Sequence, residues 1–381
     1  MPRAKPHLKA AKGVHSIRSA PCPELALDAA AAAAKTAGMK MTPYPMLLAA
    51  VMACATVPAA PAWGVLAPWT AAERATFWDS PQDAAPKELL GIKDEFKGRS
   101  YTTGDEFHLE LFAPKVRNLG GGYMGVGSDQ AYIFIGWARP EAAWLTDYDP
   151  LVVALHAAYR VFFLHSADGP AFLQRWNSKN GAESLALLKQ HLPPTVSKST
   201  LAAFRLSRSL IWARLNRVRH LLNKAKQPCF LDAAADYAHI AQLYKLERIR
   251  PMSANLLESK AIVGIGAAAR TLGVQIHGLY LSNAEEYWPY SLQFRKNIQS
   301  LPFGDAAIVW RTLSGFKKNG DYCYHIQTAA SYLGYLQRKV WKVFAIMRCG
   351  DKTPEEAAQL LYTDRVPPEL KPKSPASKRS N

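Results

Sequence analysis

The stretch GGGYMGVGSD at residues 120–129 decides the fold of this chain. Residues 123–126 have the apolar character of a short buried strand, and Gly125 and Gly127 form a G-x-G turn at its end. The following residues can cap a helix that runs to about Ala138. Because glycine has no Cβ and a helix start offers free N–H groups, this order predicts a βα unit whose backbone can closely approach a ligand.

The same rhythm of strand and helix continues downstream. Asp149 and Pro150 form a good cap and first-turn pair for the next helix. Residues 166–247 break the rhythm and read as an all-helical insertion. Alternation of strands and helices predicts an α/β fold with a Rossmann-like, doubly wound, mostly parallel sheet. The strands are expected at residues 142–146, 249–252, 275–281 and, as the last, 306–311, with a helix at 256–272.

An aspartate stands where a ribose-binding carboxylate would be expected. Asp147 follows Gly127 by 20 positions and ends the second strand, where a carboxylate can accept hydrogen bonds from ribose hydroxyls. Gln130 replaces the third glycine of the dinucleotide fingerprint, which argues against a nicotinamide or flavin. A second match to the dinucleotide fingerprint, Gly264-x-Gly266, leaves too few residues before the next strand for a crossover helix. We interpret it as small residues within one helix.

The order of these parts resembles the class I S-adenosylmethionine-dependent methyltransferase fold over about residues 120–312. The resemblance implies S-adenosylmethionine as cofactor, with Gly125 and Gly127 against it, Asp147 on the ribose and Asn255 near the adenine. The candidate cofactor-binding set is completed by Tyr123, Ser128 and Asp129; Tyr123 stands where the family usually has an acid. The chain also resembles an uncharacterised family of exported bacterial proteins, through segments such as WLTDYDP and LYLSNAEEYW.

The segment SNAEEYWPY at residues 282–290 is the densest polar and aromatic cluster. Paired carboxylates beside aromatic rings can perform acid–base work or clamp a substrate. The alternative is a helix start whose aromatic residues pack into the core. The candidate catalytic residues are Ser282, Asn283, Glu285, Glu286 and Tyr287. No C-x-x-C, H-E-x-x-H, G-x-S-x-G or P-loop occurs, so no metal site is expected and common hydrolases and nucleotide triphosphatases are disfavoured.

The N-terminal part has the layout of a secretory signal peptide at residues 39–62, preceded by an upstream or disordered segment at 1–38. Cleavage after Ala62 would make Trp63 the mature start, and a lipobox-like sequence leaves lipidation of Cys54 as the alternative. The apolar run is shorter than the ~20 residues of a bilayer span, so we expect no transmembrane segment in the mature chain. The protein is therefore predicted to be exported, either periplasmic or secreted.

The formal net charge is +17, and much of it lies in a predicted helix at residues 196–226 and in a basic, disordered tail at 366–381. No acidic residue occurs between Pro194 and Gln227. The positive face could meet an anionic surface or simply be solvated. Nucleic acid is an unfavoured partner, because only Trp212 interrupts the basic face.

These patterns predict an N-terminal cap at residues 63–119 and one α/β domain at 120–365. Two functions stay open. The first is binding of S-adenosylmethionine or a related nucleoside as a small-molecule ligand, with methyl transfer to an unknown acceptor. The second is a non-catalytic binding protein of the cell envelope that uses the same scaffold.

Overall fold

A seven-stranded sheet organises the protein in the computed structural model, which describes residues 66–89, 98–314, 321–347, 353, 356 and 358–364. The chain divides into two compact units, residues 1–62 and 63–381, and all described residues belong to the second. The predicted signal peptide, Cys54 and the basic tail lie outside the described residues. The strands are β1 (Gly122–Val126), β2 (Ala142–Asp147), β3 (Ile249–Ser253), β4 (Ile276–Tyr280), β5 (Phe303–Leu313), β6 (Cys323–Thr328) and β7 (Leu360–Thr363).

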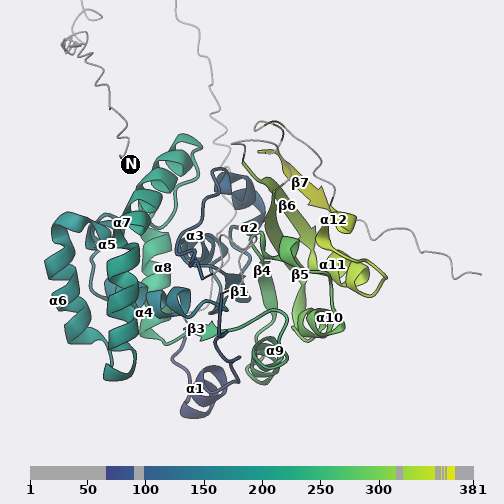
Figure 1. Cartoon of the computed structure of the whole chain (residues 1–381), viewed down its shortest axis with the longest axis horizontal. Helices are drawn as coiled ribbons and strands as arrows, with labels where there is room; N and C mark the ends of the chain where they lie inside the picture. Colours follow the sequence, from purple (N-terminus) through teal and green to yellow (C-terminus); the bar gives the residue numbers. More distant parts are fainter. Residues whose placement is uncertain are drawn as a thin grey trace, which may run out of the picture. The chain divides into compact units, whose positions relative to one another are not determined.

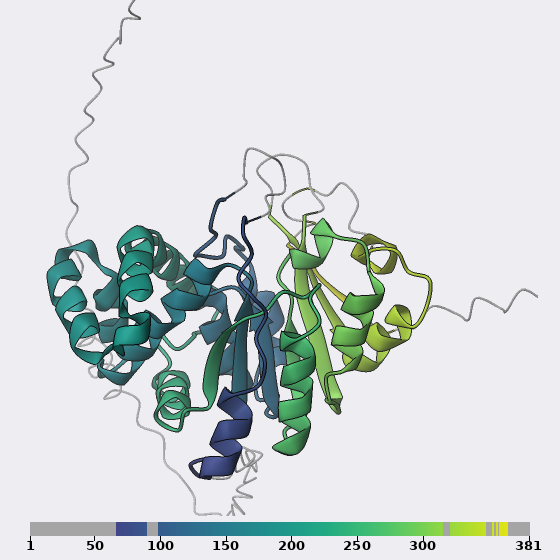
Figure 2. The same cartoon turned by 60° about the horizontal axis from the view of Figure 1, so that its bottom comes forward.

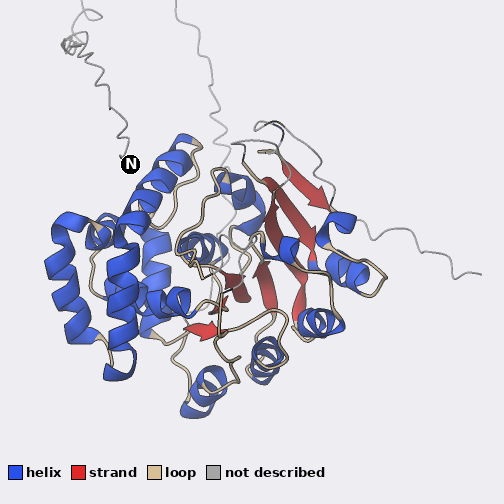
Figure 3. Ribbon diagram, in the orientation of Figure 1, coloured by secondary structure: helices blue, strands red, loops and turns tan. Residues whose placement is uncertain are grey.

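The strand order β3-β2-β1-β4-β5-β6-β7 confirms the α/β, Rossmann-like fold (Figure 1, Figure 3). Strands β1 to β5 are all parallel to one another, β6 is antiparallel to β5, and β7 is parallel to β6. The prediction that the strand near residues 306–311 is the last was wrong, because β6 and β7 extend the sheet. Strand β6 follows β5 after a short connection and pairs with it antiparallel, Leu313 opposite Cys323, which departs from the βα rhythm behind the prediction, whereas β7 pairs with β6 from a more distant segment.

Alternating strand residues feed two hydrophobic cores, one on each face of the sheet. Tyr123 belongs to the first core and Met124 to the second. Figure 2 shows helices on both sides of the strands. The first face is covered by α3 (Asp129–Ala138), α4 (Pro150–Leu164) and α8 (Ala234–Lys245), and the second by α1 (Ala71–Trp78), α9 (Ala261–Thr271), α10 (Leu292–Gln299) and α11 (Ala329–Leu336).

A block of helices follows α4 and precedes β3, in the range where the sequence predicts an insertion. Its long member α7 packs Phe204, Ile211, Leu215, Val218 and Leu222 into the first core. The block consists of α5 (Gly169–Trp176), η3 (Ser178–Asn180), α6 (Gly181–His191), α7 (Pro194–Lys224) and α8. Among the described residues no helix combines the length and the apolar character that crossing a bilayer requires.

The start of α4 follows local chemistry, whereas the residue before α3, Ser128, makes no side-chain capping hydrogen bond. Asp149 caps α4 by accepting from Leu151 N at 2.8 Å, with Pro150 in the first turn, as the sequence predicts. Gly264 and Gly266 lie in the single helix α9, also as predicted. However, α9 begins at Ala261 rather than at 256, because Asp83 accepts from the backbone N–H groups of Lys260 and Ala261. The remaining short elements are η2 (Leu109–Phe112), α2 (Ala113–Val116), η4 (Ala284–Tyr287) and α12 (Val343–Ile346).

Candidate functional site

The strand order reverses between β1 and β4, and parallel α/β sheets bind ligands beyond the carboxyl ends of the strands at such a point. Gly127 leaves β1 with φ +85° and Ser282 leaves β4 with φ +49°. A non-glycine residue in this region is under strain, which commonly marks functional sites. The Ser282 carbonyl accepts from Thr312 N at 3.1 Å, which ties the loop to β5.

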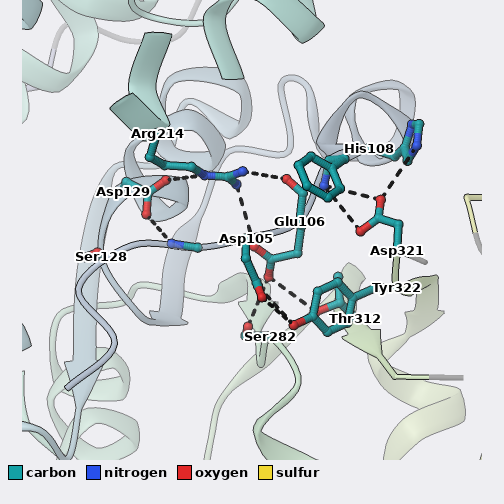
Figure 4. Close-up of polar contacts among 12 residues, drawn as sticks. Asp105, Glu106, His108, Ser128, Asp129, Arg214, Ser282, Thr312, Asp321 and Tyr322 are labelled. Carbon is teal, nitrogen blue, oxygen red and sulfur yellow. Dashed lines mark hydrogen bonds and ion pairs between the residues drawn. The ribbon is translucent and has the colours of Figure 1, made fainter. Parts of the chain in front are cut away.

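The segment Tyr101–His108 crosses this edge of the sheet; we call it the crossing segment (Figure 4). Ser128 Oγ donates to the Thr102 carbonyl at 2.5 Å, and Gly104 N donates to Asp129 Oδ1 at 2.6 Å. A Cβ on Gly104 would lie 2.5 Å from Gln130 Oε1, so the segment is pressed onto the first turn of α3. The start of α3, which the sequence analysis expects to be open to a ligand, is therefore covered by the crossing segment.

A buried carboxylate of the crossing segment fills the crevice. Glu106 is 2% exposed, and its Oε1 accepts from three hydroxyls at the ends of β4 and β5. The donors are Tyr280 at 2.8 Å, Ser282 at 3.2 Å and Thr312 at 3.4 Å.

Arg214 of α7 balances the buried carboxylates. It donates to the Glu106 carbonyl at 2.7 Å and to Asp129 Oδ2 at 3.2 Å, and its Nη2 lies 3.7 Å from Glu106 Oε2 (Figure 4). The pKa of Asp129 is nevertheless raised by burial. Protein groups thus occupy and neutralise the space in which a doubly wound fold usually places its ligand.

Asp147 lies beside this filled crevice and keeps acceptor capacity. Its Oδ2 accepts from Gly127 N at 3.2 Å and its Oδ1 from Asp149 N at 2.9 Å. A carboxylate offers about four acceptor positions, so ligand hydroxyls could still bind. The side chain is half-buried, and burial raises its pKa to about 7. The structure brings Gly127 and Asp147 together, as the sequence analysis expects.

Gly125 and Tyr123 face the core rather than a ligand. A Cβ at Gly125 would lie 2.1 Å from the Tyr123 hydroxyl, so glycine makes room for that phenol. Tyr123 is 1% exposed and its ring lies 5.9 Å from that of Trp310. The structure therefore separates both residues from Asp147, because successive strand residues point to opposite faces and this face is packed.

Asn255 closes a turn after β3. Its side chain accepts from Leu257 N at 3.0 Å, and its own N–H donates to Asp83 at 3.0 Å. It lines a pocket of about 310 Å³ together with Asp83, Ala84, Ala85, Pro86, Glu258 and Lys260.

Glu285 is enclosed in a buried ion pair. It is 0% exposed, and its Oε2 accepts from Arg311 Nε at 2.5 Å. Its Oε1 accepts from the hydroxyls of Tyr290 and Tyr332. This carboxylate of the predicted catalytic set has no access to a substrate, because its partners and the second core surround it.

The other predicted catalytic residues lie nearer the surface. Asn283 Nδ2 donates to the Tyr287 hydroxyl at 2.8 Å, and Glu286 accepts from the backbone and side chain of Ser314. Burial raises the pKa of Glu286 to about 7. Tyr287 is 41% exposed.

Residues from four segments gather around Tyr287 and form what we call the tyrosine rim. The pKa of Tyr287 is raised first by burial and then by the neighbouring groups Glu286, Asp105, Tyr101 and Tyr148. The hydroxyl of Tyr322 from the loop before β6 donates to Asp105 at 2.9 Å. The rim comprises Tyr101, Asp105, Tyr148, Tyr287 and Tyr322.

Sequence reasoning missed Tyr101, Asp105, Glu106, Arg214 and Tyr322. The crossing segment precedes β1 by some twenty residues, and no motif links it to the sheet edge. The signals present were an acid pair, Asp105-Glu106, in the predicted cap and an arginine on the apolar side of α7. Among the residues described here, no group of three His, Cys, Asp or Glu side chains is placed to hold a metal ion.

Comparison with known proteins locates the chain in a family. A search of the curated proteins finds no match. A family model matches residues 101–360, a range that contains the crossing segment, strands β1 to β6 and the helical block. On this match the chain belongs to the family described as a domain of unknown function, DUF7790.

Proposed function

We propose that the protein binds a small molecule with adjacent hydroxyl groups at the carboxyl end of β2. A nucleoside is the expected class, and S-adenosylmethionine is the ligand that the resemblance to methyltransferases implies. The observation that carries the proposal is the Asp147 carboxylate, half-buried beside the bare backbone of Gly127, with one hydrogen bond from Gly127 N and one from Asp149 N. Vicinal hydroxyls of a ribose pair naturally with such a carboxylate.

The tyrosine rim supplies surfaces for the remainder of such a ligand. Tyr101 is 51% and Tyr287 is 41% exposed, and Tyr148 follows Asp147 directly. Exposed phenol rings stack on bases or sugars and offer hydroxyls at their edges. The ligand is therefore proposed to lie over the filled crevice, outside the crossing segment.

Binding without catalysis is better supported than methyl transfer. Glu285 is committed to Arg311, Glu286 to Ser314, and Ser282 to Glu106. A general acid or base must reach the reacting atom within hydrogen-bond distance. Asn283 and Tyr287 are the members of the predicted set that stay near the surface, and neither ionises readily near neutral pH. We therefore favour the first hypothesis in its binding form, a nucleoside-binding protein on a methyltransferase-like scaffold, without methyl transfer.

Calorimetric titration tests the proposal. The full chain is titrated with S-adenosylmethionine, its demethylated product and adenosine, and the titrations are repeated on Asp147→Asn. We expect at least about tenfold weaker binding of the variant, since it loses a charged acceptor. Asp305→Asn, at an exposed position near the start of β5, makes the same charge change away from the site and should bind as the wild type does. Absence of heat with all three compounds would overturn the proposal.

Mass spectrometry of the same mixtures separates binding from methyl transfer. Unchanged S-adenosylmethionine after long incubation fits the binding role. Accumulation of the demethylated product, lost in Asp147→Asn, would instead favour the enzyme.

Export remains a proposal that rests on the sequence of residues 39–62. N-terminal sequencing of material from the producing cell should begin at Trp63, or be blocked at a lipidated Cys54. A chain that keeps Met1 would overturn it.

A further inference from the structure

Helix α7 carries a second apolar stripe on its solvent side. Its core-facing stripe is buried, yet Leu206 is 69% and Leu210 is 60% exposed. These two leucines are four residues apart and therefore adjacent on one face of the helix. Burial of the core-facing stripe accounts for the packing of α7 against the rest of the protein. It gives no reason for the exposed leucines on the solvent side.

The outer stripe belongs to a ridge with a regular pattern, which we call the outer ridge of α7. The ridge advances by steps of three or four residues, and every member is exposed. The middle is apolar and the two ends are cationic. In order the members are Lys198, Ala202, Leu206, Leu210, Ala213, Arg217, His220 and Lys224.

The charge around the ridge is not balanced locally. Helix α7 contains no acidic residue, and the exposed Arg205 and Trp212 are seven residues apart and lie along one edge of the face that carries the leucines. Lys198, Arg205 and Lys224 have no acidic partner within the described part of the chain, whereas Arg219, seven residues beyond Trp212 on the same edge, pairs with Asp232. Lys198 and Lys224 thus lie on the same side as the exposed leucines, and Arg205 lies at the edge of that side.

We infer that the outer ridge of α7 binds the surface of an anionic lipid membrane. Leucine side chains insert below the headgroups, the tryptophan lies at the interface, and lysine and arginine at both ends reach lipid phosphates. At about 1.5 Å per residue, the ridge from Lys198 to Lys224 spans roughly 40 Å, which suits a helix lying flat on a membrane. A nucleic acid would match the cations but leave Leu206 and Leu210 against phosphates, so we favour lipid. The inference is independent of any ligand at Asp147.

Vesicle flotation with the full chain tests this inference. Vesicles of phosphatidylcholine with about one third phosphatidylglycerol are compared with phosphatidylcholine alone. We expect wild-type binding to the anionic vesicles, and weakening at about 1 M salt, where the screening length is about 3 Å. Leu206→Ser with Leu210→Ser should reduce partitioning about tenfold or more. Arg205→Gln and Lys224→Gln should each reduce it about fivefold.

The matched control is Leu292→Ser with Lys296→Gln on the exposed side of α10, where Leu292 is 78% exposed. It should bind vesicles as the wild type does, and all variants should keep the wild-type melting temperature because the residues are exposed. Equal binding to neutral and anionic vesicles, or equal loss in the control, would overturn the inference. So would tight binding of a DNA duplex that depends on the cations alone, with no vesicle binding.

Discussion

Two buried arginines, Arg214 and Arg311, hold different parts of the molecule together. Arg311 of β5 is enclosed by Glu285, by Gln327 of β6 at 3.1 Å and by the ring of Tyr332 at 4.7 Å. Arg214 joins elements far apart in the chain, because its partners are Glu106 and Asp129. The first arginine consolidates one core, whereas the second fastens the crossing segment over the ligand edge. Similar chemistry thus serves general stability in one place and closure of the site in the other.

Loss of Arg311 should have the largest effect. Arg311→Met leaves Glu285 buried without its cation, which should lower the free energy of unfolding by about 3–5 kcal/mol. Urea denaturation measures the change. Arg219→Met removes a more exposed ion pair with Asp232 and should cost at most about 1 kcal/mol. Equal effects of the two substitutions would contradict the comparison.

Loss of Arg214 should act more locally. Arg214→Met leaves Glu106 and Asp129 buried without their cation, which should also lower the free energy of unfolding by about 3–5 kcal/mol and should release the crossing segment. Hydrogen exchange should quicken at the amides of Gly104, Phe107 and His108, which donate to Asp129, Asp321 and Tyr324. Amides of β6 serve as the internal control. Uniformly faster exchange would instead assign Arg214 a general stabilising role.

The pH dependence of ligand affinity should report on Asp147. Its pKa in the folded protein is raised to about 7 by burial, so the carboxyl is protonated below that pH and loses acceptor strength. Affinity for a nucleoside should fall by up to about tenfold per pH unit below about 7 and stay level above it. Asp147→Asn should abolish the dependence. A wild-type profile flat between pH ~5 and ~8 would contradict it.

Asp147 should also make the stability of the protein depend on pH, with the opposite sign to its effect on ligand affinity. Its pKa rises from 3.8 to about 7 on folding, so the folded state binds more protons than the unfolded state between these values. Stability contributed by the protonated form is therefore lost as pH rises through this window. Glu286 should contribute in the same direction, and the difference between wild type and Asp147→Asn isolates Asp147.

Removal of the Tyr287 hydroxyl should have the smallest effect. Tyr287→Phe keeps the ring and removes one half-exposed hydrogen bond from Asn283. We expect less than about threefold weaker ligand binding by calorimetry. A much larger loss would place this hydroxyl in direct contact with the ligand.

The fold was more predictable than the site. The βα unit at residues 122–138, the cap at Asp149 and the single helix around Gly264 follow from short-range patterns, which the sequence displays directly. Strands β6 and β7 were missed because β6 is antiparallel to β5, outside the βα rhythm, and β7 pairs with a strand far away in the chain. The proximity of Gly127 and Asp147 was anticipated, because both end neighbouring strands.

By itself, the sequence determined the alternating cores, the glycine turn and a carboxylate at the end of β2, because strand period, helix period and backbone freedom are local properties. Only the tertiary structure decided that Glu106, 176 positions before Ser282, fills the crevice, and that Glu285 is sealed by Arg311. Such contacts depend on which distant surfaces bury each other and which charges must then be neutralised. The tertiary structure also decided that Leu206 and Leu210 of α7 are exposed, since packing selects which of two apolar stripes enters the core.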